Sequence, residues 1–332
     1  MELTFQKPFD AHLHLRQGAV LSGYARRAAA FFESALVMPN TKPPILTADD
    51  LKRYRAAITA AVPNWRPLMS FQIHSHADIP ALKAAGAVAG KYYPAGLTNA
   101  DSSSCQTLAD FDSVLAQMEE FGIVLSVHCE APLYSEEVRH RVLDESLEVS
   151  VRFPNLKIVL EHISLEREVE AVRLAGENVA ATLTAHHLTF TAADFIGSKL
   201  NPHLFCKPIL QNEKHRGALR AAAVSGNPRF FFGSDSAPHL PEFKTGTAVS
   251  PGIYSMPVTL PLLACLFEEA DSLTALESFV SVFGRRFYGI PETSEKITMI
   301  KKKLKVPFET DGVVPLCAGA ELPWSVKESE EK

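Results

Sequence analysis

The chain has 332 residues, of which 46% are hydrophobic and 21% charged, and its formal net charge is −5. This composition is typical of a globular protein with a sizeable core, and the slight acidic balance excludes a basic surface for nucleic acid. We therefore expect no polyanion such as nucleic acid as a partner.

The cysteines and the first residues bear on the compartment. No CxxC motif occurs, and a sparse, odd number of cysteines in a long chain indicates reduced thiols rather than a disulfide framework. Residues 1–7 have no apolar signal-peptide core, and no run of about 18 apolar residues follows anywhere. We expect a soluble cytoplasmic protein that does not bind membranes. The five cysteines are Cys105, Cys129, Cys206, Cys265 and Cys317.

Short apolar runs that end in polar residues predict eight strands. Several runs, such as 158–160 and 230–232, are apolar on both faces, as expected of parallel strands that helices cover. The predicted strands are 9–15, 34–40, 67–74, 87–94, 123–130, 156–164, 179–186 and 229–236.

Several of the gaps between these runs predict helices. Thr47 and Asp50 form a capping-box pattern at the start of 47–62, and apolar residues at helical spacing cover 108–121 before Gly122. Strands that alternate with helices predict an α/β fold, and eight such units predict a (β/α)8 TIM-type barrel. We expect residues 1–332 to form one barrel domain, since such barrels run from about 200 to over 400 residues.

An open, doubly wound sheet is the alternative fold. Against it, no GxGxxG or P-loop motif follows any predicted strand. The small polar segment 96–104 follows the fourth strand, and we expect it to be a mobile loop over the active face. The lysines of 301–305 and the charged residues of 328–332 are expected to be solvated surface.

Barrel enzymes place their reacting groups at the carboxyl ends of strands. His12 and His14 end the first strand, and residues two apart on a strand share a face, so both imidazoles can bind one ion. A histidine pair of this kind is by itself more often structural. The joint pattern favours a metal site, because the strand ends together supply His12, His14, Asn40, Lys91, His128, His162, Asp235 and His239.

Lys91 is the unusual member of this group. An ammonium beside divalent cations would be repelled, so the lysine must lose its proton or be modified. A neutral amine that captures carbon dioxide becomes an anionic carbamate with two oxygens, which can bridge two ions. The alternative is a surface lysine in a salt bridge.

These motifs resemble dihydroorotase of the short, bacterial monofunctional type, a member of the amidohydrolase superfamily. The resemblance runs from about Phe9 to Lys327 and so covers nearly the whole chain. The segments that carry it are Asp10–Arg16, Val37–Thr41, Lys91–Ala95, Val127–Glu130, Leu160–Ile163 and Gly233–His239.

The resemblance implies an amidohydrolase-like barrel with two zinc ions per subunit. His12, His14 and Asp235 would hold one ion, and His128 and His162 the other. A carboxylated Lys91 and a hydroxide would bridge the two ions. Asp235 would be the catalytic residue, taking a proton from the hydroxide and passing it to the departing ring nitrogen.

The resemblance also implies the substrate contacts. Arg16, Asn40 and His239 would bind the substrate carboxylate, with His14 beside them. Singly, Arg16 could instead pair with an acidic neighbour, Asn40 could cap a helix, and His239 could sit in a turn. Further substrate contacts would come from Thr98 in the mobile loop and from the backbone of Lys207 and Pro251. A leucine is more familiar in the family at the position of Lys207. Asn99 replaces a second loop threonine, and His186 and His187 are expected to be supporting or structural residues.

The implied function is that of a zinc-dependent hydrolase acting on a cyclic amide. It would cyclise N-carbamoyl-L-aspartate reversibly to (S)-dihydroorotate with loss of water, the third step of de novo pyrimidine (UMP) biosynthesis. Other cyclic amidases, such as a hydantoinase or allantoinase, would share the metals but would not need Arg16, Asn40 and His239 together. A non-catalytic scaffold is a further alternative, and a homodimer is expected from the resemblance.

Overall fold

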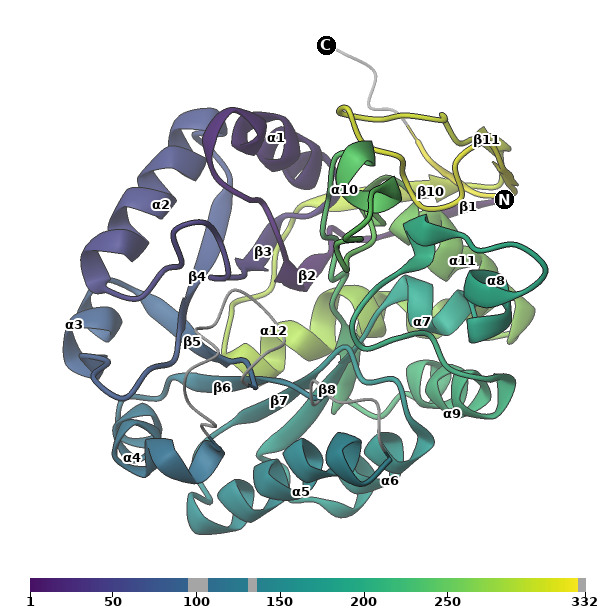
Figure 1. The fold of residues 1–332 in the computed structure, drawn as a ribbon. Coiled ribbons are helices and arrows are strands. Elements are labelled where there is room, and N and C mark those ends of the chain that lie inside the picture. The colour runs from purple at the N-terminus through teal and green to yellow at the C-terminus, as the bar shows by residue number, and fades with distance from the viewer. Residues whose placement is uncertain (95–106, 131–135, 328–332) are drawn as a thin grey trace.

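The eight predicted strands form one parallel sheet in the computed structural model, which describes residues 1–94, 107–130 and 136–327, without the side chains of 136–139. Each strand pairs in parallel with the next along the chain (Figure 1). The strands are β2 (Phe9–Leu13), β3 (Ser34–Val37), β4 (Arg66–Gln72), β5 (Ala87–Tyr92), β6 (Val124–His128), β7 (Ile158–Glu161), β8 (Val179–Leu183) and β9 (Phe230–Phe232).

The sheet closes where the first and last strands meet. Leu13, at the end of β2, forms a parallel bridge with Ser236, just beyond β9. The backbone N–H of Asp235 donates to the carbonyl of His12 at 2.9 Å, and that of His14 donates to Ser236 at 3.2 Å. The predicted (β/α)8 barrel is confirmed, and its seam runs through three of the candidate site residues.

Helices surround the sheet, as Figure 1 shows. The predicted helix at 47–62 is confirmed as α2, and the pattern at 108–121 forms a 3₁₀ turn, Leu108–Phe111, followed by α4. The α-helices are α1 (Leu21–Phe31), α2 (Ala48–Ala61), α3 (Ile79–Ala84), α4 (Asp112–Glu120), α5 (Glu136–Arg152), α6 (Glu166–Leu174), α7 (Ala185–Thr189), α8 (Ala192–Ile196), α9 (Glu213–Val224), α10 (Pro241–Thr245), α11 (Thr259–Glu269) and α12 (Phe283–Tyr288).

The barrel interior is apolar at one end and polar at the other. A compact cluster of inward-facing residues draws on all eight strands, with Phe9, Val124 and Phe231 among them and Leu68 of β4 at its edge. Side chains alternate along a strand, so residues two and four positions further on, such as His128 after Val124, also face inward. The polar ends of the strands therefore converge on the open end of the barrel.

A bulge in β2 changes this alternation. Asp10 pairs with Ala35 but Leu13 pairs with Val37, so β2 carries one residue more than β3 over that stretch. A bulge of this kind re-aims the side chains that follow it. Phe9 and Ala11 therefore face the apolar interior, while His12 and His14 face the interior at the polar end.

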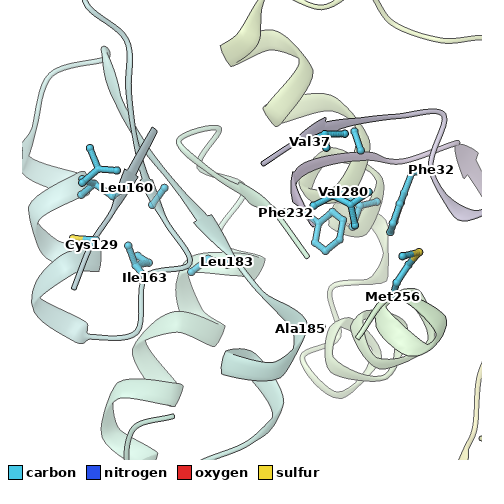
Figure 2. Packing of buried hydrophobic residues seen from close by; sticks show 14 of the residues in the cluster. Phe32, Val37, Cys129, Leu160, Ile163, Leu183, Ala185, Phe232, Met256 and Val280 are labelled. Atoms are coloured by element: carbon cyan, nitrogen blue, oxygen red, sulfur yellow. The ribbon is translucent and has the colours of Figure 1, made fainter. Parts of the chain in front are cut away.

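A second core layer lies between the strands and the helices. Figure 2 shows Phe32, Val37, Phe232, Met256 and Val280 gathered in this layer. Burying such side chains removes apolar area from water, which contributes about 25 cal/mol per Å².

Two small antiparallel sheets beside the barrel were not predicted. The strands β1 (Glu2–Gln6), β10 (Lys296–Ile300) and β13 (Ser325–Val326) form one, and β11 (Leu304–Lys305) and β12 (Glu321–Leu322) the other. Core residues of the first sheet pack in the same cluster as the outer layer of the barrel. That residues 1–332 form one domain stays a prediction.

The structure describes part of the surface and four of the five cysteines. Lysines 301, 302, 303 and 305 are exposed, as expected, whereas 96–104 and 328–332 lie outside the described residues. Cys129, Cys206, Cys265 and Cys317 are free thiols. Within the described ranges, no helix combines the length and the apolar character needed to cross a membrane.

The capping box at the start of α2 is expected to stabilise the helix. Thr47 Oγ1 accepts from the N–H of Asp50, and the Asp50 carboxylate accepts from the N–H of Thr47. We expect Thr47→Ala to lower the free energy of unfolding by about 0.5–2 kcal/mol, measured by urea denaturation. Thr274→Ala, the same change at an exposed position, should change it by less than about 0.5 kcal/mol. Equal effects of the two changes would contradict the role of the cap.

Candidate active site

Six candidate residues lie at the carboxyl ends of five strands, at the open end of the barrel. All six are buried, which is unusual for groups that carry or attract charge. Their exposed fractions are His12 1%, His14 6%, Lys91 0%, His128 5%, His162 2% and Asp235 7%. The alternative that Lys91 is a surface lysine is therefore wrong.

His12, His14 and Asp235 form one group. A ligand atom from each lies within 4.8 Å of the others. His14 Nε2 is 3.0 Å from Asp235 Oδ1, and His12 Nε2 is 3.5 Å from the same oxygen. The group combines two imidazoles with one carboxylate, a donor set suited to a divalent cation such as zinc.

Lys91, His128 and His162 form an adjoining group. The rings of His128 and His162 lie 4.5 Å apart, and the ring of His162 lies 5.0 Å from that of His12. Among the described residues, Lys91 Nζ, His128 Nε2 and His162 Nδ1 are buried and have no hydrogen-bond partner. Buried polar atoms without a partner are costly, so three of them side by side indicate that a bound ion belongs here. The donor set thus fits a pair of metal ions.

The backbone is strained at two of these positions. His162 has φ +42° and Asp235 φ +41°, in the left-handed region that residues with a side chain rarely adopt. Arg16, on the substrate side, has φ +62°. Such strain persists only where the surrounding structure holds it, and it clusters at functional sites.

Burial sets the protonation of the basic groups. It lowers the pKa of Lys91 to about 8 and that of His14 to about 4. It also lowers the pKa of His128 and of His162. These three histidines are therefore neutral at pH 7, which is the form that binds metal, and Lys91 has an accessible neutral amine.

Two carboxylates that the sequence interpretation left out support this group. Glu161 Oε2 lies 2.9 Å from His12 Nδ1 and accepts from the Thr182 hydroxyl at 2.6 Å. Asp10 Oδ1 accepts from the N–H groups of His12 and Ser234, one on each side of the barrel seam. A carboxylate on the second nitrogen of a histidine fixes the ring and raises its basicity. The place of Glu161 at the end of β7 was the signal that could have identified it.

The predicted substrate residues line a cavity of about 870 Å³ beside this group. His12, His14, His128, His162 and Asp235 form part of its wall. Lys91 is fully buried and is not among the lining residues. The predicted substrate residues in the lining are Arg16, Asn40, Lys207, His239 and Pro251.

Arg16 and His239 lie next to each other in this cavity. Arg16 Nη2 is 3.0 Å from His239 Nε2, and Arg16 Nε donates to the carbonyl of Pro238 at 3.1 Å. His239 Nε2 is also 3.0 Å from the carbonyl of Pro251. Thr47 rather than Asn40 caps α2, so Asn40 is free of that alternative role. The contacts predicted at Thr98 and Asn99 fall outside the described residues.

Lys244 of α10 is a further residue that the sequence interpretation missed. Its ammonium is buried and donates to the carbonyls of Phe205, Ser250 and Gly252 at 2.8–3.0 Å. Phe205 lies two residues before Lys207, and Ser250 and Gly252 flank Pro251. Lys207 and Pro251 are the two positions of predicted backbone contact with the substrate. Lys244 thus ties together the two loops that form this side of the cavity.

Comparisons with known proteins bear on the family. No family model matches the chain. It is 39% identical to the dihydroorotase of Teredinibacter turnerae, with 98% of each chain covered. It superimposes on the dihydroorotase of Saccharomyces cerevisiae in complex with 5-fluoroorotic acid with a TM-score of 0.90 and 33% identity, covering 98% of each chain. The dihydroorotase of Campylobacter jejuni gives 0.87 and 35%, covering 98% of this chain and 97% of that one.

The chain belongs to the dihydroorotase family. The predicted family, its cyclic-amide hydrolase activity and the amidohydrolase-like barrel are thereby confirmed. An L-hydantoinase from Arthrobacter aurescens and an inactive dihydroorotase-like domain from Chaetomium thermophilum share the fold, with TM-scores of 0.81 and 0.69. At 14% and 13% identity these two show the fold alone.

Removal of the Lys244 ammonium tests its structural role. Lys244→Met leaves three carbonyls without their donor, and we expect the free energy of unfolding to fall by about 1–3 kcal/mol. Lys302→Met, at an exposed position, should change it by less than about 0.5 kcal/mol. Both values come from urea denaturation, and a loss no larger in Lys244→Met than in the control would rule out this role.

Proposed function

We propose that the six buried residues form a binuclear zinc centre. His12, His14 and Asp235 would hold one ion, His128 and His162 the other, and Lys91 would bridge the two after carboxylation. The observation that carries the proposal is that Lys91 Nζ, His128 Nε2 and His162 Nδ1 are buried and have no hydrogen-bond partner in the described part of the chain. They adjoin the group of one carboxylate and two imidazoles. When bound, zinc lowers the pKa of water to about 7 and polarises the amide carbonyl under attack.

Asp235 is the proposed catalytic residue. Its carboxylate lies at the floor of the cavity, next to His12 and His14, and its backbone is fixed by the barrel seam. In ring opening, water adds to the amide carbon and the carbon–nitrogen bond breaks. Asp235 takes the proton of the attacking water and delivers it to the departing nitrogen, so one group serves both directions of the reaction.

Lys91 reaches the bridging form through its neutral amine. The amine nitrogen attacks the carbon of carbon dioxide and loses a proton, which yields an anionic carbamate. Burial favours this step because it disfavours the ammonium. The carbamate supplies two oxygens and a negative charge where the partnerless nitrogen now lies.

Arg16, Asn40 and His239 are proposed to bind the carboxylate of the substrate, with His14 between them and the metals. A guanidinium matches a carboxylate by two parallel hydrogen bonds. Lys207 and Pro251 would add backbone contacts and Thr98 a contact from its loop. The yeast relative holds 5-fluoroorotic acid. The substrates are then N-carbamoyl-L-aspartate and (S)-dihydroorotate, as the pyrimidine-biosynthetic activity of the family requires.

The assembly and the compartment are proposed on different grounds. We propose a homodimer because the resemblance implies one, and a cytoplasmic location because the sparse cysteines indicate reduced thiols. The proposed partner is a small-molecule substrate, with neither nucleic acid nor membrane as a partner.

Removal of the Arg16 guanidinium distinguishes a dihydroorotase from a cyclic amidase that does not bind a substrate carboxylate. We expect Arg16→Gln to raise the KM for L-dihydroorotate about 10- to 100-fold, which corresponds to about 1.5–3 kcal/mol for a charged hydrogen bond. The metal centre should stay loaded. Arg26→Gln, on the exposed face of α1, should leave KM unchanged. Steady-state ring opening, with hydantoin assayed in parallel, is the measurement, and turnover of hydantoin but not of dihydroorotate would favour a hydantoinase.

Carboxylation of Lys91 predicts a pH-dependent activation. Metal-free protein given zinc at a fixed concentration of dissolved carbon dioxide should regain activity faster as the pH rises, up to about 8, and no faster above it. The sign follows because only the neutral amine reacts and burial lowers its pKa. Lys91→Ala should not regain activity. Full activation of the wild type in carbon dioxide-free buffer would show that no carbamate is needed.

A further inference from the structure

A second cluster of metal-binding side chains lies outside the six-residue centre. His186 and His187 are in α7, directly after β8, and Cys206 follows the 3₁₀ turn Pro202–Leu204. All three are buried, with exposed fractions of 0%, 2% and 1%. A ligand atom from each lies within 4.8 Å of the others. None of the three has a role in the proposed reaction.

The distances suit a single ion between them. Cys206 Sγ lies 4.0 Å from His187 Nε2. Zinc bonds of about 2.0–2.1 Å to nitrogen and 2.3 Å to sulfur place such atoms about 3.6 Å apart in a tetrahedral site and at most about 4.4 Å apart. The carbonyl of Pro208 is 2.9 Å from His187 Nε2 and 3.1 Å from Cys206 Sγ, so its oxygen lies close to two of the three ligand atoms.

The ring of His186 is the member of the cluster without a hydrogen-bond partner among the described residues. Within the described part of the chain, neither Nδ1 nor Nε2 of this fully buried ring has a hydrogen-bond partner. Its ring centroid lies 4.6 Å from that of His187. A buried imidazole normally satisfies at least one nitrogen, so an ion bound to this ring would remove the penalty.

His187 has a second contact that orients its ring. Thr184 Oγ1, at the N-cap of α7, lies 2.9 Å from His187 Nδ1. Nε2–H donates to the carbonyl of Pro208, so Nδ1 accepts from the Thr184 hydroxyl. An ion bound at Nε2 would reverse the second bond, with Nδ1–H donating to Thr184. Metal-binding histidines commonly have such a partner on the other nitrogen.

We propose that His186, His187 and Cys206 form a third metal site, separate from the binuclear centre, that binds zinc. Two imidazoles and a thiolate are a donor set typical of zinc, whereas magnesium and calcium prefer oxygen. The carbonyl of Pro208 or a water completes four-fold coordination.

Binding of the ion balances in protons and charge. The zinc–sulfur bond forms as the Cys206 thiol releases its proton to solvent. The ion, one thiolate and two neutral imidazoles leave one net positive charge.

The ion would act on the wall of the substrate cavity. It would link α7, which begins directly after β8, to the segment 205–208, in which Lys207 lines the cavity. Lys244 holds the same segment through the carbonyl of Phe205. The site is thus structural and stiffens a loop that contacts the substrate.

Cobalt substitution tests the proposal, because a sulfur ligand gives bound Co²⁺ a charge-transfer absorption in the near ultraviolet. None of the six residues of the binuclear centre offers sulfur. Metal-free wild-type protein is titrated with Co²⁺ in bicarbonate buffer, and bound metal per chain is measured after gel filtration. We expect three equivalents in the wild type, with the absorption band, and two without the band in Cys206→Ser.

Two further variants make the outcome specific. Cys129→Ser should keep both the band and the third equivalent, because Cys129 is buried elsewhere, beside the end of β6. His186→Asn should lose the third equivalent while it retains the thiol. Two equivalents and no band in the wild type would overturn the proposal without any variant. A band that survives Cys206→Ser and disappears in Cys129→Ser would overturn it as well.

Discussion

The hydrogen bond from the Asp235 N–H to the His12 carbonyl is the interaction on which the rest of the structure depends. It closes the barrel between β2 and β9, and it joins two residues of the proposed metal centre. Asp10 strengthens the same seam by accepting from the N–H groups of His12 and Ser234. Closure of the barrel therefore also fixes the backbone positions of His12 and Asp235 relative to each other.

Much of the fold could be predicted from the sequence because it depends on local pattern. Each of the eight strands is a short apolar run with a polar end, and Thr47 and Asp50 mark the start of α2. The bulge in β2 could not be predicted, since it appears only when Asp10 and Leu13 are paired with β3. The small sheet of β1, β10 and β13 was missed because its strands come from opposite ends of the chain.

The same distinction holds for the site. Residues of a type that commonly binds metal, such as His128 and Asp235, could be predicted from their places at the ends of strands. Lys244 could not, because its partners are three backbone carbonyls that carry no sequence signal. The group of His186, His187 and Cys206 was likewise hidden, since Cys206 comes 19 residues after His187. Long-range contacts, rather than residue types, define these two features.

Diffraction from crystals of zinc-loaded protein, recorded at the zinc absorption edge, would locate the proposed ions. We expect two anomalous peaks among the six residues, one beside His12, His14 and Asp235 and one beside His128 and His162. Continuous density should join Lys91 Nζ to both peaks. A single peak, or two peaks with an unmodified Lys91 between them, would show that no bridged binuclear centre forms.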